Sequence, residues 1–155
     1  MRNILLIDLN VGRNFNLESS TQHSENKIGE STFTYTGLDR VAGVYTKAPK
    51  EIKSIDTENL KTSISIRVGG DTTLKAAEIQ NNNGSTIIQT QGNLNIGRIT
   101  TEINNRGYAD QNNYNYSKKQ QDVGSVIQSV ADTRLQAENI AVKGSQVSSE
   151  QGSTI

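Results

Sequence analysis

Short stretches in which apolar and polar residues alternate recur along the chain and predict β-strands. The clearest examples are LKA at 74–76, LNI at 94–96 and LQA at 135–137. A period of two places alternate side chains on one face of a strand. The flanking residues are dense in Thr, Ser, Gly, Ile and Val, which favour strands and turns over helix. Because such short strands are unstable alone, they are expected to join larger sheets.

The tetrad Gly-Ser-x-[Ile/Val] repeats along the chain and sets the spacing of these strands. Its copies lie at residues 84–87, 124–127, 144–147 and 152–155. The second and third copies are 20 residues apart, the first and second are 40 apart, and the fourth follows the third by 8. The glycines of the first three copies, Gly84, Gly124 and Gly144, are expected at corners, where the chain bends tightly or adopts positive φ.

A second repeated element has the same period. Residues 71–76 (DTTLKA) match residues 132–137 (DTRLQA), and a weaker copy contains Leu94, which follows Leu74 by 20 residues. Twenty residues suit three short strands and three corners. Stacking such units pairs each strand with its equivalent one unit away.

These spacings predict an all-β fold, a right-handed parallel β-helix of about twenty residues per coil that forms one domain over residues 1–155. Only 32% of the residues are apolar and Trp is absent, which suits a solenoid because it needs only a thin file of apolar side chains. Partial disorder is the alternative explanation of this composition. The coils are expected at about 1–18, 62–86, 87–99 and 124–143.

Two polar segments, at about 19–61 and 100–123, interrupt the period. Each has strand-like alternation around aromatic residues, as TFTYT at 32–36 and NYNYS at 113–117. Both are interpreted as excursions that leave the coils as β-hairpins, the first with a turn at Thr36–Asp39. Disordered loops are the alternative.

Charge and the chain ends narrow the functional classes. Sixteen basic and sixteen acidic residues give zero net charge, which disfavours a nucleic-acid partner. The absence of Cys excludes disulfides and thiolate metal sites. Residues 1–10 are too briefly apolar for a signal peptide, and the chain stops within a fresh Gly-Ser-Thr-Ile copy. We therefore expect the export signal outside this sequence and a longer parent protein.

The segments at 69–76 (GGDTTLKA) and 140–147 (IAVKGSQV) resemble the haemagglutinin repeats of filamentous-haemagglutinin-type exoproteins. The resemblance covers nearly the whole chain and is stronger after Lys61. This family includes the carrier proteins of contact-dependent growth inhibition. Its members are products of two-partner secretion, exported through a dedicated outer-membrane β-barrel transporter.

The resemblance implies a structural or adhesive segment of a secreted bacterial surface protein, a monomeric rod without enzymatic activity. Its partner would be a protein or glycan receptor on a host or neighbouring bacterial cell. The same rod fits a stalk or delivery segment of a growth-inhibition toxin carrier. A carbohydrate-active β-helix enzyme is the alternative from another class. No residue here is assigned to transporter recognition or toxicity.

An enzyme would need clustered acids or a nucleophile with its base. Asp71 and Asp132 occupy matching repeat positions, but an Asp at a corner commonly accepts hydrogen bonds from nearby backbone N–H groups. His23 is the only histidine and lies in the first excursion, where a solvated loop residue is expected. The sequence therefore predicts no catalytic residue, no cofactor and no metal site.

Five aromatic residues are the candidates for partner binding: Phe33, Tyr35, Tyr108, Tyr114 and Tyr116. All lie in the polar excursions, where exposed aromatic rings stack on sugars or pack against a protein. The alternative is that the rings only pack across their own hairpins as cross-strand pairs.

Overall fold

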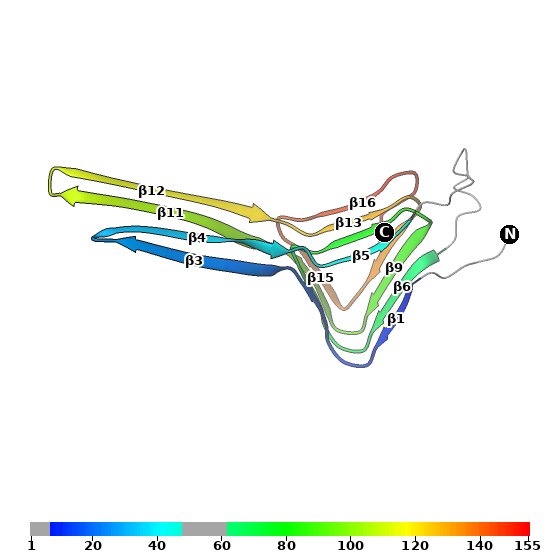
Figure 1. Ribbon diagram of the computed structural model, residues 1–155. Helices are drawn as coiled ribbons and strands as arrows, with labels where there is room; N and C mark the ends of the chain where they lie inside the picture. Colours follow the sequence, from blue (N-terminus) through cyan, green and yellow to red (C-terminus); the bar gives the residue numbers. More distant parts are fainter. Residues whose placement is uncertain (1–6, 48–61) are drawn as a thin grey trace.

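The computed structural model describes residues 7–47 and 62–155, which contain β-strands and turns but no helix. The strands form three parallel sheets and one antiparallel sheet, each of four strands. The all-β prediction is therefore confirmed. Figure 1 shows the parallel sheets grouped together, with the antiparallel sheet extending from them as an arm.

The first parallel sheet contains, in order, β1 (Ile7–Val11), β6 (Thr62–Val68), β9 (Ser85–Thr90) and β14 (Thr133–Gln136). Its strand register places four apolar residues in one row, Leu9, Ile66, Ile88 and Leu135. Ile66 and Ile88 in the middle of the row are fully buried, whereas the two end members are only partly buried. The row is therefore a ladder whose interior rungs are covered on both sides.

The other two parallel sheets repeat this design. The second contains β2 (Phe15–Glu18), β7 (Thr72–Lys75), β10 (Asn93–Gly97) and β15 (Asn139–Val142). The third contains β5 (Gly43–Thr46), β8 (Glu78–Asn81), β13 (Val126–Ser129) and β16 (Gln146–Ser149). Their ladders are Leu17–Leu74–Ile96–Val142 and Val44–Ile79–Ile127–Val147. Side chains from all three ladders meet in one hydrophobic cluster.

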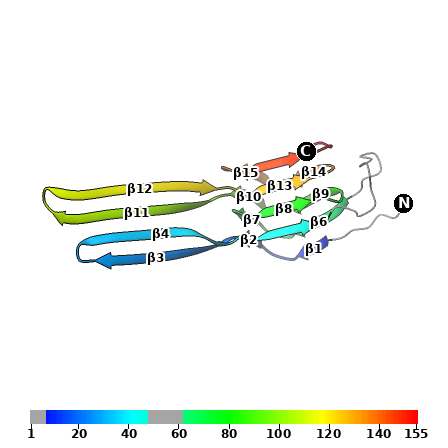
Figure 2. The ribbon, with the colours of Figure 1, turned by 45° about the horizontal axis from the view of Figure 1, so that its top comes forward.

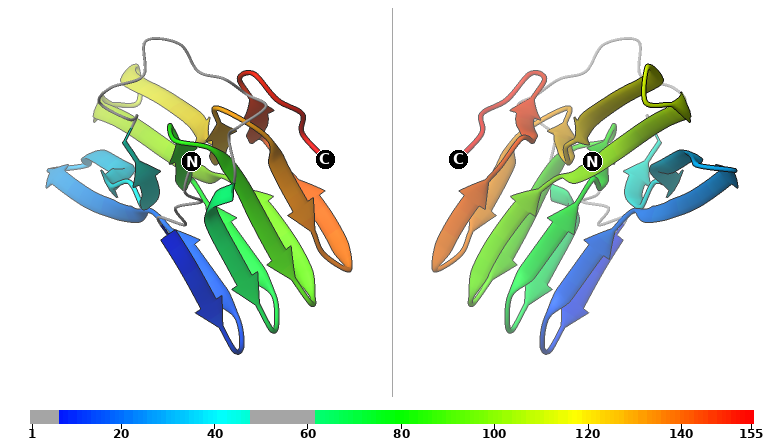
Figure 3. Two further views of the ribbon diagram at one scale, coloured as in Figure 1. Left: turned by 90° about the vertical axis from the view of Figure 1, so that its right-hand side faces the viewer. Right: turned by 90° about the vertical axis from the view of Figure 1, so that its left-hand side faces the viewer.

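The chain visits the three sheets in the same order four times, and we call each circuit a pass. The passes run over residues 7–46, 62–81, 85–129 and 133–149. Figure 3 shows the first two strands of successive passes lying side by side in chain order. The expected coil boundaries differ from the passes. The second pass ends at Asn81 rather than at about 86, and the third begins at Ser85 rather than at about 87 and continues through the second excursion to Ser129. The fourth pass runs over 133–149 rather than 124–143.

Part of the predicted register is confirmed and part is wrong. Gly124 and Gly144 lie at the same corner in neighbouring passes, and Ile127 pairs with Val147 at the expected spacing of 20 residues. Leu94, however, pairs with Thr72, not with Leu74. The apolar alternation is the same in all three ladders, so it does not determine the pairing of individual residues.

Residues 71–76 and 132–137 match in sequence but do not occupy equivalent positions in the structure. Residues 72–75 form β7 of the second sheet, whereas residues 133–136 form β14 of the first sheet. The Gly-Ser tetrads also lie at two different corners. Thr86 of the first tetrad pairs with Thr133 in the first sheet, whereas Val126 of the second tetrad pairs with Gln146 of the third tetrad in the third sheet. Both corners use a small residue before a short strand, which explains the shared sequence.

The three expected corner glycines differ in what makes glycine necessary. Gly144 has positive φ (58°), whereas Gly84 and Gly124 do not. A Cβ atom at Gly124 would collide with the carbonyl oxygen of Gly144 in the next pass. The corner between β7 and β8 is closed by Ala76, the one described non-glycine residue with positive φ (49°).

A buried polar cluster surrounds Asn81, which is 1% exposed. Its Oδ1 atom accepts hydrogen bonds from Thr46 Oγ1 (2.8 Å), Ser63 Oγ (2.9 Å) and the backbone nitrogens of Asn83 (3.0 Å) and Gly84 (3.1 Å). Its Nδ2 atom donates to Ser85 O (2.9 Å) and Thr86 Oγ1 (3.1 Å). The Asn81 side chain thus ties the first three passes together at the corner before Gly84.

The arm is the antiparallel sheet, with strand order β12 (Asn113–Val123), β11 (Ile99–Asp110), β4 (Ser31–Arg40), β3 (Ser20–Ile28). Both polar excursions therefore contain hairpins, at residues 20–40 and 99–123, and the disordered-loop alternative does not hold for these two segments. The first hairpin ends at Arg40, since residues 43–46 form β5 of the third sheet, and the part at 48–61 lies outside the described residues.

The predicted turn at Thr36–Asp39 is wrong, because these residues lie within β4 and the chain turns at Gly29 and Glu30. Gly37 serves packing: the ring of Tyr35 lies over it, in the space that a Cβ atom would occupy. Aromatic rings commonly cover strand glycines in this way. The glycine at this position therefore marks a site of close packing in a strand.

The two hairpins leave the first and third passes at the same corner, between the second and third sheets. The second pass has only Ala76 and Ala77 there. Neighbouring passes are one strand apart, about 4.8 Å, so a hairpin two strands wide fills the space of two passes. This match lets β4 pair with β11 from Thr32 opposite Arg106 to Thr36 opposite Glu102. Figure 2 shows the resulting pair of hairpins side by side.

Candidate partner-binding site

The arm has two faces, and strand register assigns each side chain to one of them. Directly opposite residues share a face, and consecutive residues alternate between faces. We call one the Phe face, which carries Phe33 and Tyr35, and the other the Tyr face, which carries Tyr108, Tyr114 and Tyr116. The five predicted aromatic residues are thus divided between opposite sides of one sheet.

The Phe face is a mixed apolar strip. Tyr35 lies opposite Ile103, and Phe33 lies opposite Asn105 on one side and Asn26 on the other. Phe33 and Ile103 are each 39% exposed. A shallow groove on this face, lined by Tyr35, Ile103 and Lys119 among others, continues toward the parallel sheets. The side chains are suited to apolar contact with a surface.

The Tyr face carries its aromatic residues close to the far end of the arm. Tyr108 lies directly opposite Tyr114, and Arg106 lies opposite Tyr116. Tyr114 is 71% exposed and Tyr116 is 64% exposed. These residues form a hollow of about 260 Å³, which we call the Tyr hollow, lined by Arg106, Tyr108, Gln111, Tyr114, Asn115 and Tyr116.

The turn between β11 and β12 fixes this end of the arm. The Asp110 carboxylate accepts hydrogen bonds from the Asn112 backbone nitrogen (2.8 Å) and from Asn113 Nδ2 (3.0 and 3.1 Å). These bonds, first of all that from Asn113, lower the pKa of Asp110 below its ordinary value. Ser31 adds a link between hairpins, because its Oγ accepts from the Tyr108 backbone nitrogen (3.1 Å). The Tyr hollow therefore lies at an end of the arm that these hydrogen bonds hold in place.

A polar network lies beside the Tyr hollow on the same face. Glu102 accepts hydrogen bonds from Asn104 Nδ2 (2.6 Å) and Gln120 Nε2 (3.4 Å), and Lys118 Nζ lies 3.4 Å from its carboxylate. The bond from Asn104, then that from Gln120, lowers the pKa of Glu102. The other amide atom, Asn104 Oδ1, is buried and has no hydrogen-bond partner within the described residues. This network links β11 and β12 through polar side chains on the Tyr face.

The five aromatic residues differ in whether they pack against another ring across their own hairpin. Tyr108 and Tyr114 do form a direct cross-strand aromatic pair. Phe33, Tyr35 and Tyr116 lie opposite non-aromatic residues. Sequence reasoning missed Arg106, although its place two residues before Tyr108 puts both on one strand face.

The candidate catalytic residues lie in structural roles. Asp71 Oδ1 accepts from the Asn93 backbone nitrogen (2.8 Å), and Asp132 Oδ1 accepts from that of Ser153 (2.7 Å). The expected corner role is confirmed, but the two corners precede different sheets. His23 lies in strand β3, not in a loop, with Nδ1 2.8 Å from Thr36 Oγ1.

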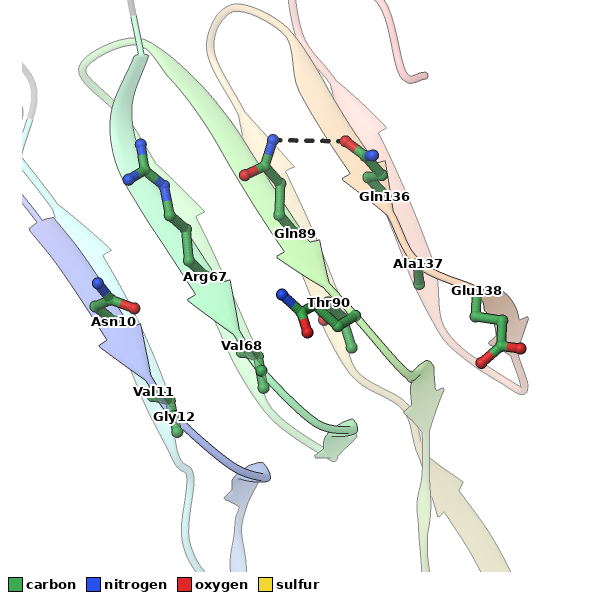
Figure 4. Close-up of a pocket in the computed structure, with 12 residues that line it drawn as sticks. Asn10, Val11, Gly12, Arg67, Val68, Gln89, Thr90, Gln136, Ala137 and Glu138 are labelled. Atoms are coloured by element: carbon green, nitrogen blue, oxygen red, sulfur yellow. Dashed lines mark hydrogen bonds between the residues drawn. The ribbon is translucent and has the colours of Figure 1, made fainter.

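A second concavity follows the outer side of the first sheet (Figure 4). Strand register aligns Asn10, Arg67, Gln89 and Gln136 in one outward row across four passes. Gln89 Nε2 lies 3.5 Å from Gln136 Oε1, a long hydrogen bond. The row is polar, and this is the one hydrogen bond between its described side chains.

Among the described residues no group of three or more His, Cys, Asp or Glu side chains is placed to hold a metal ion. The described part also contains no helix long and apolar enough to cross a membrane. The chain matches no protein-family model, no curated protein and no solved structure. The arm is therefore the candidate site on geometry alone.

Proposed function

We propose that this chain is a structural and adhesive segment of a secreted bacterial surface exoprotein of the filamentous-haemagglutinin type. The observation that carries the proposal is the arm. Hairpins from two separate passes merge into one sheet that extends away from the parallel sheets and exposes aromatic side chains on both faces.

In this proposal the four passes are coils of a right-handed parallel β-helix. Three in-register parallel sheets and three apolar ladders support it. Each coil contacts only its neighbours, so the stack is stiff along its axis and its stability is a sum of neighbour terms. A rod of this kind holds its arm at a fixed place along its length.

The proposed partner is a protein or glycan receptor on a host cell or a neighbouring bacterium. The parent protein would reach the cell surface through an outer-membrane transporter. Zero net charge argues against a nucleic-acid partner. The acids Asp71 and Asp132 accept backbone hydrogen bonds at separate corners, which argues against a carbohydrate-active enzyme that uses them as a catalytic pair.

The chain supplies its own template for an armless control. Lys75 and Glu78 of the second pass align with Gly97 and Val126 of the third, so Ala76-Ala77 replaces residues 98–125. The same pair replaces residues 19–42 in the first pass. Beads coated with the full chain should bind epithelial cells, erythrocytes or Gram-negative bacteria, and armless beads should not. Equal binding by folded armless protein, or no binding by either, would refute the proposal.

A further inference from the structure

We propose that the Tyr hollow binds a sugar ring that carries a carboxylate, as part of an acidic glycan. The inference rests on the adhesive role proposed above and names the ligand class of the arm. Three observations lead to it: the placement of three tyrosines, an arginine with no acidic partner among the described residues, and a lining without aliphatic side chains.

The tyrosines form a platform on a rigid strand pair. Tyr114 and Tyr116 are two residues apart on β12, so their rings emerge on one face about 7 Å apart along the strand. Tyr108 lies opposite Tyr114 and widens the platform on β11. Aromatic rings held in this way offer flat apolar faces with polar edges, which match the C–H face and hydroxyl rim of a pyranose.

Arg106 gives the hollow its charge. It lies opposite Tyr116 and forms no ion pair within the described residues. Two acids lie four residues from Arg106 on the same strand: Glu102 is engaged by Asn104, Gln120 and Lys118, and Asp110 is engaged by Asn112 and Asn113 at the turn. A guanidinium group binds a carboxylate through two parallel hydrogen bonds. Arg106 is thus available for a carboxylate on a sugar that stacks beside it.

Strand register places a second cation, Lys27, in the same row as Arg106. Arg106 lies opposite Thr32, which lies opposite Lys27 on β3, so both cations belong to one row. Lys27 Nζ is 3.5 Å from Glu25, which leaves Arg106 as the cation of that row without an acid. The rim of the hollow adds the side-chain amide of Gln111, which is a donor and an acceptor for sugar hydroxyls, whereas the side chain of Asn115 lies opposite Gly107 on the Phe face.

The two faces of the arm differ in the partner they suit. The Phe face exposes Ile28, Phe33 and Ile103, whose aliphatic and phenyl groups form ordinary protein contacts. The Tyr hollow is lined only by phenol, guanidinium and amide groups with their backbone. A polyhydroxylated, anionic ligand satisfies this lining, whereas an apolar protein surface would leave its donors unpaired.

The experiment titrates the full chain with three carboxylated probes, trigalacturonic acid, a glucuronic-acid-containing tetrasaccharide and sialyllactose, followed by NMR and calorimetry. Maltotriose and a sulfated trisaccharide are the comparison ligands. At least one carboxylated probe should bind and shift the Tyr108, Tyr114 and Tyr116 signals. Arg106→Gln should weaken binding about tenfold or more, and Tyr116→Ala about threefold to tenfold.

Matched variants outside the hollow are Arg67→Gln on the first sheet and Tyr45→Ala on the third, and both should bind as the wild type does. Arg106→Lys keeps the charge and should recover only part of the affinity. The inference is overturned if no carboxylated probe binds, if the sulfated ligand binds equally well, or if the hollow variants bind normally. Cell-binding beads separate the two proposals: a wild-type level of cell binding by Arg106→Gln beads rejects the hollow but leaves the adhesive arm in place.

Discussion

Replacing Asn81 by leucine tests whether the buried polar cluster holds the passes together. Leucine has the same number and branching of side-chain heavy atoms and removes all six hydrogen bonds of the amide group. Asn81 is 1% exposed, so water cannot replace the lost partners without opening the corner. The substitution therefore removes the hydrogen bonds while keeping the branched shape of the side chain.

The expected magnitude follows from the groups left behind. The Gly84 backbone N–H is buried and cannot rotate toward another acceptor, and the Ser63 hydroxyl is 1% exposed. An unsatisfied buried donor costs about 1–3 kcal/mol. Two such groups give a loss of about 2–6 kcal/mol in the free energy of unfolding. For a chain of this size that lowers Tm by about 4–24 °C.

Urea and thermal unfolding followed by circular dichroism would measure this loss. The matched control is Asn95→Leu, because Asn95 lies on the exposed side of β10. The control should change the free energy of unfolding by about 0.5 kcal/mol or less. If Asn81→Leu unfolds like the control, the cluster does not stabilise the stack and the reasoning is wrong.

Four further outcomes are expected. Ile88→Ala should lose about 2–5 kcal/mol of unfolding free energy and Leu135→Ala clearly less, because only Ile88 is covered by passes on both sides; equal losses in denaturant titrations would contradict the ladder. Gly124→Ala should destabilise by about 1–3 kcal/mol through its clash with the next pass, whereas Gly12→Ala, with nothing within 4 Å, should not; thermal melts compare the two. Removing the second hairpin alone should speed amide exchange in β3 and β4, because an isolated two-stranded hairpin is marginal, and unchanged exchange would show that the hairpins are independent. The pKa of Glu102 is lowered below 4.5, so its stabilisation of the arm is present above that pH and lost as pH falls through the folded-state pKa; Glu102→Gln should remove this pH dependence of exchange in β11.

The sequence by itself determined the strand content and the stacked design. Alternating apolar positions are enough to predict short strands, because a pleated strand exposes every second side chain on one face. The 20-residue spacing of Gly124 and Gly144 also predicted the true neighbours in the third sheet. The polar excursions were predicted as hairpins from the same alternation around their aromatic residues.

Tertiary structure decided which strands pair. Leu74 and Leu135 have near-identical surroundings in the sequence but lie in different sheets, since all three ladders need the same apolar pattern. The chain turns at Gly29, which has positive φ, whereas Gly37 lies within a strand, where the ring of Tyr35 packs over it.

The candidate site depended on tertiary structure most of all. Pairing of β4 with β11 joins residues about seventy positions apart, and it occurs because a hairpin is as wide as two passes. Register then placed Arg106 beside Tyr116 on one face and moved Phe33 and Tyr35 to the other. Local sequence specifies which side chains alternate, whereas only long-range pairing specifies which of them meet.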